Sequence, residues 1–221
     1  MSLARPSPRR SATTPRPRTK TRERILDVCR ELFNARGPAS VTTAEIARSL
    51  GINEGNLYYH FKRKEDVLEA LFDRFSDELL RTAVVPQEDQ AAVERYRAYL
   101  TGWFRIMWEW RFFYRDGAAV FRLAPALRSR LREVSDEGLL LTRKAVVDME
   151  RGGLIAIPEE RIDRTIVNAW IIATYWIDHL RSRHGIEEPT REQIDEGAAQ
   201  IMSLFAPYLT EAGRELSAPH A

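Results

Sequence analysis

The sequence lacks the features of secreted and membrane-spanning proteins. It contains one cysteine in 221 residues, so no internal disulfide can form, and a reducing cytoplasm is the expected setting. No run of about 18 uncharged apolar residues is present, and we therefore expect no transmembrane helix and no membrane partner. The N-terminus is basic but has no apolar segment behind it, so we expect no secretory signal.

The sequence also lacks the common catalytic motifs, including a phosphate-binding loop, a nucleophile elbow and the spacing of zinc ligands. His179 and His184 are five residues apart, so they do not share a helical face, and Asp178 is expected at a solvated helix end. Cys29 falls on the core face of a predicted helix, where it serves as a small apolar residue. We therefore expect no enzymatic activity, no cofactor and no bound metal.

Strand-like alternation is absent over any useful length, whereas helical periodicity continues from Lys20 onward. Gly37-Pro38, Gly51 and Gly152-Gly153 supply helix stops. The pattern predicts an all-α protein with about nine helices. Their expected ranges are 20–35, 42–50, 53–61, 64–82, 88–111, a shorter segment at 112–125, 126–151, 158–182 and 190–212.

Charge is unevenly distributed, although the net charge is only +2. Residues 1–64 contain 14 lysines and arginines and 5 acidic residues, whereas residues 65–221 contain 20 and 27. A basic N-terminal third beside an acidic remainder indicates that one part of the chain meets a polyanion. The expected organisation is a disordered basic tail at 1–19, a DNA-binding domain at 20–64, a helical effector-binding and dimerisation domain at 65–213 and a frayed tail at 214–221.

Two short predicted helices joined by a tight turn at Gly51 form a helix-turn-helix. Thr42 and Glu45 have the spacing of a capping box at the start of the first helix, although Thr43 could itself be the N-cap. Such a unit places the start of its second helix in the major groove of DNA. The sequence therefore predicts a double-stranded DNA partner.

In the second helix, which Asn53 can cap, Leu57 and Phe61 face inward. Because neighbouring side chains on a helix point about 100° apart, Tyr58 and Tyr59 cannot both be buried. Hydroxyl, imidazole and ammonium groups suit phosphate contacts, an asparagine amide suits a base or a phosphate, and a glycine permits close approach to the duplex. The residues predicted to contact DNA are Thr42, Thr43, Asn53, Glu54, Gly55, Asn56, Tyr58, Tyr59, His60 and Lys64.

Residues 21–70, from TRERILDVCRELFNARG through VTTAEIARSLGINEGNLYYHFKRKEDVLEA, resemble the N-terminal domain of the TetR family of transcription regulators. The resemblance implies an all-helical homodimer with a C-terminal ligand-sensing domain, whose operator binding changes when an effector binds. Glu54 departs from the pattern, since members often have a basic or neutral residue there. A carboxylate repels phosphate but could accept a hydrogen bond from cytosine N4. By motif position, the implied DNA contacts are Thr43, Gly55, Tyr58, Tyr59, His60 and Lys64.

Arg16-Pro17-Arg18 precedes the first helix. Family members with such basic arms can reach the minor groove, and phosphate attraction alone would also explain the basic tail. A deletion of residues 1–18 that changed neither operator affinity nor its salt dependence would exclude a DNA-binding role.

Large aromatic residues are concentrated in the second half of the chain. Of the twelve positions from Trp103 to Tyr114, eight are aromatic or methionine. Core packing explains most of them individually, but so many neighbouring rings cannot all pack on one partner, and some should line a cavity or an interface. We therefore predict an aromatic-lined site for a largely apolar effector. Its candidate wall residues are Trp103, Met107, Trp170 and Tyr175.

The helix at 158–182 is apolar almost all round and must be covered on two sides. Together with the last helix, it would form an isologous four-helix interface in a homodimer. Dimerisation would also let two recognition helices address half-sites about one DNA turn apart. The predicted interface residues are Ile166, Trp170, Ala173, Ile177, Ile201 and Phe205.

The sequence thus predicts a cytoplasmic, ligand-responsive repressor that a hydrophobic small molecule releases from its operator. Two alternatives within reach of the same fold are an activator and a regulator controlled by a partner protein. A third is an architectural DNA-binding dimer with no small-molecule effector. A large internal cavity would favour a sensor, and a filled core would favour a plain dimerisation module.

Overall fold

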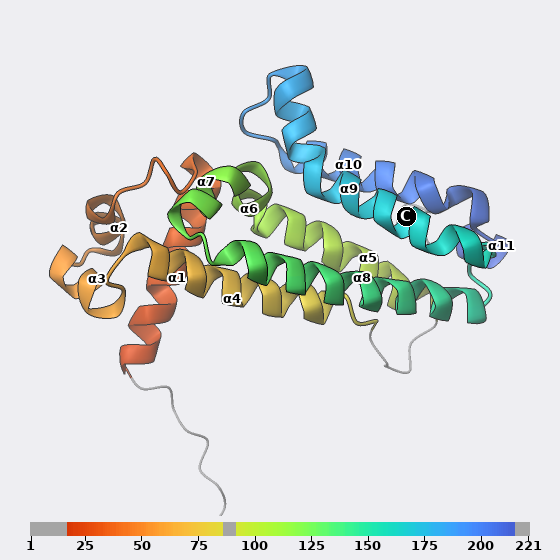
Figure 1. The fold of residues 1–221 in the computed structure, drawn as a ribbon, viewed down its shortest axis with the longest axis horizontal. Helices are drawn as coiled ribbons and strands as arrows, with labels where there is room; N and C mark the ends of the chain where they lie inside the picture. The colour runs from red at the N-terminus through yellow and green to blue at the C-terminus, as the bar shows by residue number, and fades with distance from the viewer. Residues whose placement is uncertain (1–16, 86–91, 215–221) are drawn as a thin grey trace, which may run out of the picture.

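Three helices form a small bundle at one end of the molecule in the computed structural model, which describes residues 17–85 and 92–214 (Figure 1). They are α1 (Pro17–Arg36), α2 (Thr43–Leu50) and α3 (Glu54–His60). Ile25, Cys29 and Phe33 recur on one face of α1 and are fully buried. The periodicity of α1 therefore determines which of its faces packs against α2 and α4.

Helix α1 begins at Pro17, three residues before the predicted start at Lys20. Proline is favoured in a first helical turn, because its missing N–H needs no partner there. The rest of the expected tail, residues 1–16, lies outside the described residues. Residues 215–221 of the predicted C-terminal tail lie outside them as well.

Helix α4 (Lys64–Thr82) connects the small bundle to the rest of the molecule and has the bounds that its periodicity predicts. Its apolar side packs against α1 at one end and against α5 and α8 further along. At a rise of about 1.5 Å per residue, this helix spans roughly 28 Å. The buried side chains of α4 are Val67, Leu68, Ala70, Leu71, Phe72, Phe75, Ser76 and Leu79.

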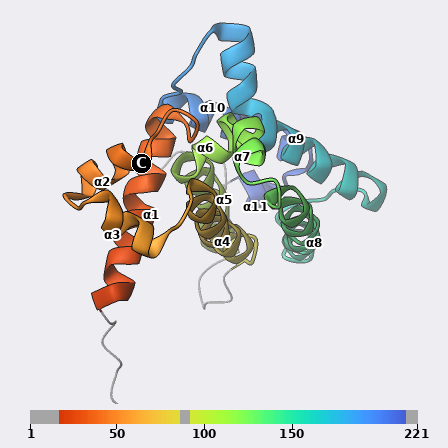
Figure 2. The same ribbon diagram turned by 60° about the vertical axis from the view of Figure 1, so that its left-hand side comes forward.

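The second domain is built around long helices that run along α4. In Figure 1, α4, α5 and α8 extend in one layer, and α9 and α10 lie over it. The view in Figure 2 shows the small bundle set apart from this layered part. The helices of the second domain are α5 (Ala92–Glu109), α6 (Arg111–Arg115), α7 (Gly117–Leu123), α8 (Leu127–Arg151), α9 (Glu159–His184) and α10 (Arg191–Phe205).

Two predicted helices are interrupted. The segment at 112–125 contains the two short helices α6 and α7, and the predicted helix at 190–212 ends at Phe205. Pro207 cannot donate a backbone hydrogen bond, and a 3₁₀ turn (Ala206–Tyr208) followed by α11 (Glu211–Arg214) replaces the continuous helix. The described residues therefore contain eleven α-helices instead of about nine, but the all-α prediction is confirmed.

The described residues contain no β-strand. Their β-type backbone pairing is one isolated antiparallel bridge, between Ile155 and Leu209. The bridge fastens the end of the chain to the α8–α9 loop: the Ala156 N–H donates to the Tyr208 carbonyl at 2.8 Å. No helix within 17–85 or 92–214 is long and apolar enough to cross a membrane.

Candidate nucleic-acid interface and cavity

The start of α2 is fixed by a reciprocal capping box, as its spacing predicts. The Glu45 N–H donates to Thr42 Oγ1 at 3.2 Å, and the Thr42 N–H donates to Glu45 Oε2 at 2.8 Å. Thr42 is therefore the N-cap and Thr43 is the first helical residue. The hydrogen bond from the Thr42 N–H, together with those from the Arg36 side chain and the Thr42 hydroxyl, lowers the pKa of the Glu45 carboxyl from 4.5 to about 2.

The turn between α2 and α3 needs a glycine for its backbone conformation. Gly51 adopts φ +67°, in the left-handed region, and its N–H donates to the Arg48 carbonyl at 3.1 Å. Asn53 then begins α3, since its side-chain oxygen accepts from the Asn56 N–H at 2.7 Å. The helix-turn-helix predicted around Gly51 is present with both predicted N-caps.

Helix α3 separates its packing residues from its exposed ones. Leu57 and Phe61 are buried, whereas the side chains of Tyr58 and Tyr59 are 41% and 57% exposed. His60 is half-buried, and its ring meets that of Tyr59 edge to face at 5.3 Å between centroids. Both tyrosines are therefore available at the surface, in agreement with the geometric argument that they cannot both be buried.

Three of the predicted DNA contacts form a hydrogen-bonded group across α2 and α3. The Thr43 hydroxyl donates to Glu54 Oε2 at 3.2 Å, and Tyr58 Oη lies 3.2 Å from Thr43 Oγ1. Because Thr43 uses its proton on Glu54, the Tyr58 hydroxyl can donate to Thr43. Glu54 is also the first residue of α3, where the helix dipole favours a negative charge. This unusual carboxylate therefore has a hydrogen-bond partner within the protein and a favourable position at the start of a helix.

Lys64 has a bracing role that the sequence did not predict. Its Nζ donates to the carbonyls of Pro38 at 2.8 Å and Val41 at 2.7 Å, which fastens the start of α4 to the α1–α2 loop. Burial lowers the pKa of Lys64, while the charge of Glu45 raises it in part. Two of the three ammonium protons are thus engaged within the protein, leaving one for a phosphate.

Gly55 and Asn56 are exposed beside the tyrosines. Local packing favours a glycine at position 55, in addition to the close approach to DNA that the sequence predicts. A Cβ at position 55 would lie 3.3 Å from Asn53 Oδ1, the atom that caps α3. The exposed basic residues Arg48 and Lys62 also lie in the helix-turn-helix segment. They were absent from the predicted contacts, although their charge was a usable signal.

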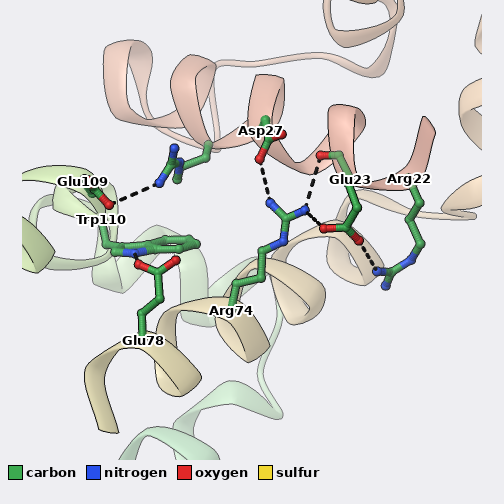
Figure 3. Close-up of polar contacts among 8 residues, drawn as sticks. Arg22, Glu23, Asp27, Arg74, Glu78, Glu109 and Trp110 are labelled. Carbon is green, nitrogen blue, oxygen red and sulfur yellow. Dashed lines mark hydrogen bonds and ion pairs between the residues drawn. The ribbon is translucent and has the colours of Figure 1, made fainter. Parts of the chain in front are cut away.

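Ion pairs connect α1 to α4 (Figure 3). Arg74 on α4 pairs with Glu23 and with Asp27, at 2.8 Å for the latter, and both carboxylates belong to α1. On the same side of α1, the Trp110 indole N–H donates to Glu78 Oε2 at 2.9 Å. The Arg74 ion pairs therefore join α1 to α4, whereas the Trp110–Glu78 hydrogen bond holds α4 to the junction of α5 and α6.

A buried contact lies at the end of α1. The Asn34 amide donates to the Glu109 carbonyl at 2.7 Å and accepts from the Phe112 N–H at 3.1 Å. Arg115 donates to the Phe33 and Asn34 carbonyls, each at 3.0 Å. Because helix ends leave carbonyls without intrahelical partners, Arg115 supplies the donors that α1 needs. Sequence reasoning missed Asn34, whose polar side chain on a helix carries no distinctive pattern.

A cavity of about 120 Å³ lies in the second domain, between α4, α5, α8, α9 and α10. Trp103, Met107 and Trp170, which the sequence nominated, line it together, and the two indole rings meet edge to face at 5.9 Å. The other lining residues are Leu79, Tyr99, Leu100, Phe104, Tyr114, Thr142, Ala145, Val146, Met149, Ala169, Ala173, Thr174, Ile201, Met202, Phe205 and Leu209.

Tyr175 does not belong to this wall, contrary to the prediction. Its side chain is 62% exposed, and it does not line the cavity. Tyr175 lies five positions after Trp170, and at about 100° per position their side chains point about 140° apart on the helix. When Trp170 points inward, Tyr175 must therefore point outward.

The pairing of the predicted dimer residues with a second subunit stays a prediction, and within one subunit all six take part in packing. Ile166 and Ile177 are buried in the core of the single chain. The other four, Trp170, Ala173, Ile201 and Phe205, line the cavity. The apolar pattern of α9 contains two stripes, and periodicity alone does not tell which stripe the same chain covers. The stripe left exposed on α9 consists of Val167, Ile171 and Tyr175.

A helix-turn-helix with an exposed polar-aromatic helix, carried on a separate helical domain, defines the class of helix-turn-helix DNA-binding proteins. Residues 25–71 match the family model described as bacterial regulatory proteins, tetR family. Residues 74–216 match the TetR model described as bacterial transcriptional repressor. The chain therefore belongs to the TetR family of bacterial transcriptional regulators, which bind DNA and are not enzymes.

Solved and curated proteins agree with this assignment. The crystal structure of a TetR-family transcriptional regulator from Marinobacter aquaeolei VT8 is 30% identical, has a TM-score of 0.76, and covers 89% of this chain and 96% of its own. The regulator AcrR of Shigella flexneri is 39% identical over 54 residues, 24% of this chain and 25% of AcrR. The repressor KstR2 of Mycolicibacterium smegmatis is 35% identical over 82 residues, 34% of this chain and 40% of KstR2. The chain thus spans less than half the length of these curated relatives.

Proposed function

We propose that this regulator is a repressor that binds operator DNA as a homodimer and is released by a small apolar molecule in the cavity of its second domain. The cavity is the observation that carries this proposal, because a plain dimerisation module would have a filled core. The protein would act in the cytoplasm, where bacterial operators lie.

The proposed DNA-binding surface is the exposed side of the helix-turn-helix. Tyr58, Tyr59 and His60 carry donors suited to phosphates and sugars, while Asn56 and Glu54 would contact base edges. The N-terminus of α2, at Thr42 and Thr43, adds an environment that favours phosphate. The full proposed set is Thr42, Thr43, Asn53, Glu54, Gly55, Asn56, Tyr58, Tyr59, His60 and Lys64, with Arg48 and Lys62 as additional phosphate partners.

Helix α4 offers a direct connection between the cavity and the DNA-binding domain. Leu79 near its end lines the cavity, and Lys64 at its start braces the α1–α2 loop. The two residues are separated by about 22 Å of helix. A molecule that displaces Leu79 would therefore shift the position of the helix-turn-helix through a rigid element.

The proposed dimer uses the exposed stripe on α9 in place of the buried residues first considered. Val167, Ile171 and Tyr175 follow one another at four-residue intervals and are all exposed. Leu140, on the adjacent helix α8, is 71% exposed. Isologous pairing of this surface would cover four large apolar side chains in each subunit and place two recognition helices on one duplex.

A pull-down of genomic fragments with the purified protein would recover the operator. Fluorescence anisotropy on that operator would then follow its release by a panel of apolar compounds. We expect at least one compound to weaken binding by 10-fold or more, corresponding to a coupling free energy of about 1.4 kcal/mol. The matched variant Ala173→Leu, which adds volume to the cavity wall, should bind the operator normally and lose this response.

Two results would contradict the proposal. If compounds that bind the cavity leave operator affinity unchanged, the protein is not controlled through this site. If Ala173→Leu responds as the parent protein does, release originates elsewhere. Tighter operator binding in the presence of a compound would indicate the opposite direction of control.

A further inference from the structure

Tyr99 places an unsatisfied hydroxyl in the wall of the cavity. The residue lies in α5, lines the cavity and is 7% exposed. Its Oη is buried and has no hydrogen-bond partner. A buried hydroxyl without a partner is costly, because the water that solvated it in the unfolded chain is not replaced. Such a group in a ligand cavity points to a polar atom supplied by the ligand.

The neighbours of this hydroxyl leave it free to act as a donor. Burial raises the pKa of Tyr99, and the nearby Trp103 and Thr142 side chains lower it in part. Neither of these side chains forms a hydrogen bond with Tyr99 Oη. The Thr142 hydroxyl donates to the Gly138 carbonyl at 2.8 Å and keeps lone pairs that could accept, but it forms no hydrogen bond with Tyr99 Oη. The Trp103 indole can only donate. Among the residues that the structure describes, the proton of the Tyr99 hydroxyl therefore has no acceptor within hydrogen-bond distance.

The rest of the wall excludes a charged ligand. The residues that line the cavity include no lysine, arginine, histidine, aspartate or glutamate. A carboxylate or an ammonium group would lose its water shell there and gain no opposite charge. A cavity of about 120 Å³ also favours a compact ligand.

We propose that the molecule bound here is compact, neutral and apolar except for one hydrogen-bond acceptor, which accepts the proton of the Tyr99 hydroxyl. This inference rests on the proposed function, because it assigns the chemistry of the same cavity. A ketone, an ester or an ether on a single ring has this character. A pure hydrocarbon lacks the acceptor, and a carboxylate carries an unpaired charge.

Three probes of similar size separate these possibilities: ethylbenzene, acetophenone and benzoate. Isothermal titration calorimetry on the full-length protein would measure their affinities. We expect acetophenone to bind roughly 2- to 10-fold more tightly than ethylbenzene, the value of one neutral hydrogen bond, and benzoate not to bind measurably. In Tyr99→Phe, this preference for acetophenone should disappear while ethylbenzene binds at least as well.

Two further variants make the test specific. Tyr96→Phe removes a buried hydroxyl from the same helix outside the cavity wall, and it should keep the preference. Tyr114→Phe removes another hydroxyl of the wall and should keep it as well. Equal affinity of the parent protein for ethylbenzene and acetophenone would overturn the role of Tyr99 but leave the cavity as an apolar site. A preference lost in Tyr114→Phe instead would reassign the anchor. Failure of all three probes to bind would refute this inference and count against the proposed effector cavity itself.

Discussion

At the scale of single residues, α3 shows how seven positions serve two purposes. Leu57 is buried and anchors the helix, whereas its neighbours Tyr58 and Tyr59 stay exposed because each step along a helix turns the side chain by about 100°. The packing and DNA-binding roles therefore belong to different residues and can be separated by substitution.

Tyr59→Ala should weaken operator binding by about 10-fold, because it removes a donor to the charged phosphate backbone. Since the side chain is 57% exposed, unfolding by urea should change by no more than about 0.5 kcal/mol. Leu57→Ala, at a buried position of the same helix, should lose about 2 to 5 kcal/mol. An equal loss of stability in both variants would show that Tyr59 packs and does not serve the DNA surface.

The capping carboxylate of Glu45 predicts a pH dependence. Its pKa is lowered from 4.5 to about 2 in the folded protein, so its contribution to stability is complete above about pH 4.5 and is lost as the pH falls toward 2. Glu45→Gln keeps the capping geometry but not this titration. Thermal unfolding followed by circular dichroism should show the stability gap between the parent and the variant closing over that window. A gap that stays constant from pH 6 to pH 2.5 would contradict the assignment.

At the scale of helices, two kinds of contact join α1 to the second domain. The ion pairs of Arg74 with Glu23 and Asp27 are partly exposed (Figure 3), and such pairs contribute little because water already solvates both charges. Asn34 is buried and satisfies the buried Phe112 N–H and the partly buried Glu109 carbonyl. The buried amide should therefore matter more than the more conspicuous ion pairs.

Asn34→Ala is expected to lower the free energy of unfolding by about 1 to 3 kcal/mol, because it leaves the Glu109 carbonyl and the Phe112 N–H without partners. Arg74→Ala should cost about 1 kcal/mol or less. Urea titration of both variants and the parent measures the difference. If Arg74→Ala proves the more damaging change, the surface ion pairs, and not the buried amide, connect the two domains.

At the scale of the whole molecule, the two faces of α9 have different surroundings. One face contributes Ala169, Trp170 and Ala173 to the cavity of its own subunit. The other face exposes Val167, Ile171 and Tyr175. A cavity behind a proposed dimer surface means that ligand binding and subunit pairing would act on the same helix.

Ile171→Glu should convert the proposed dimer into a monomer at micromolar concentration, because each interface would bury two unpaired carboxylates. Operator affinity should fall by at least 10-fold, since the two helix-turn-helix units would no longer be linked. Val84→Glu, an equally exposed apolar position outside this surface, is the control and should change neither property. Sedimentation velocity measures the state of assembly. A parent protein that sediments as a monomer would exclude the proposed dimer.

Local chemistry explains why much of the fold was predictable. The capping box at Thr42, the left-handed Gly51 and the Asn53 cap each depend on residues a few positions apart, so the helix-turn-helix could be predicted correctly from the sequence. Helix α4 was equally predictable because its apolar stripe continues without interruption over its whole length. The break after Phe205 was also a local signal, carried by Pro207, but the apolar periodicity around it obscured its effect.

The sequence by itself determined the fold class, the helix-turn-helix and the exposed tyrosines, since periodicity and capping act within one or two helical turns. Only the tertiary structure decided that Trp170 and Phe205 line a cavity within the subunit, and that Tyr175 faces outward. It also decided that Lys64 braces a loop and that the Tyr99 hydroxyl has no partner. These facts depend on which helices lie against one another. Residues far apart in the sequence determine that arrangement, and the periodicity of a single helix does not contain it.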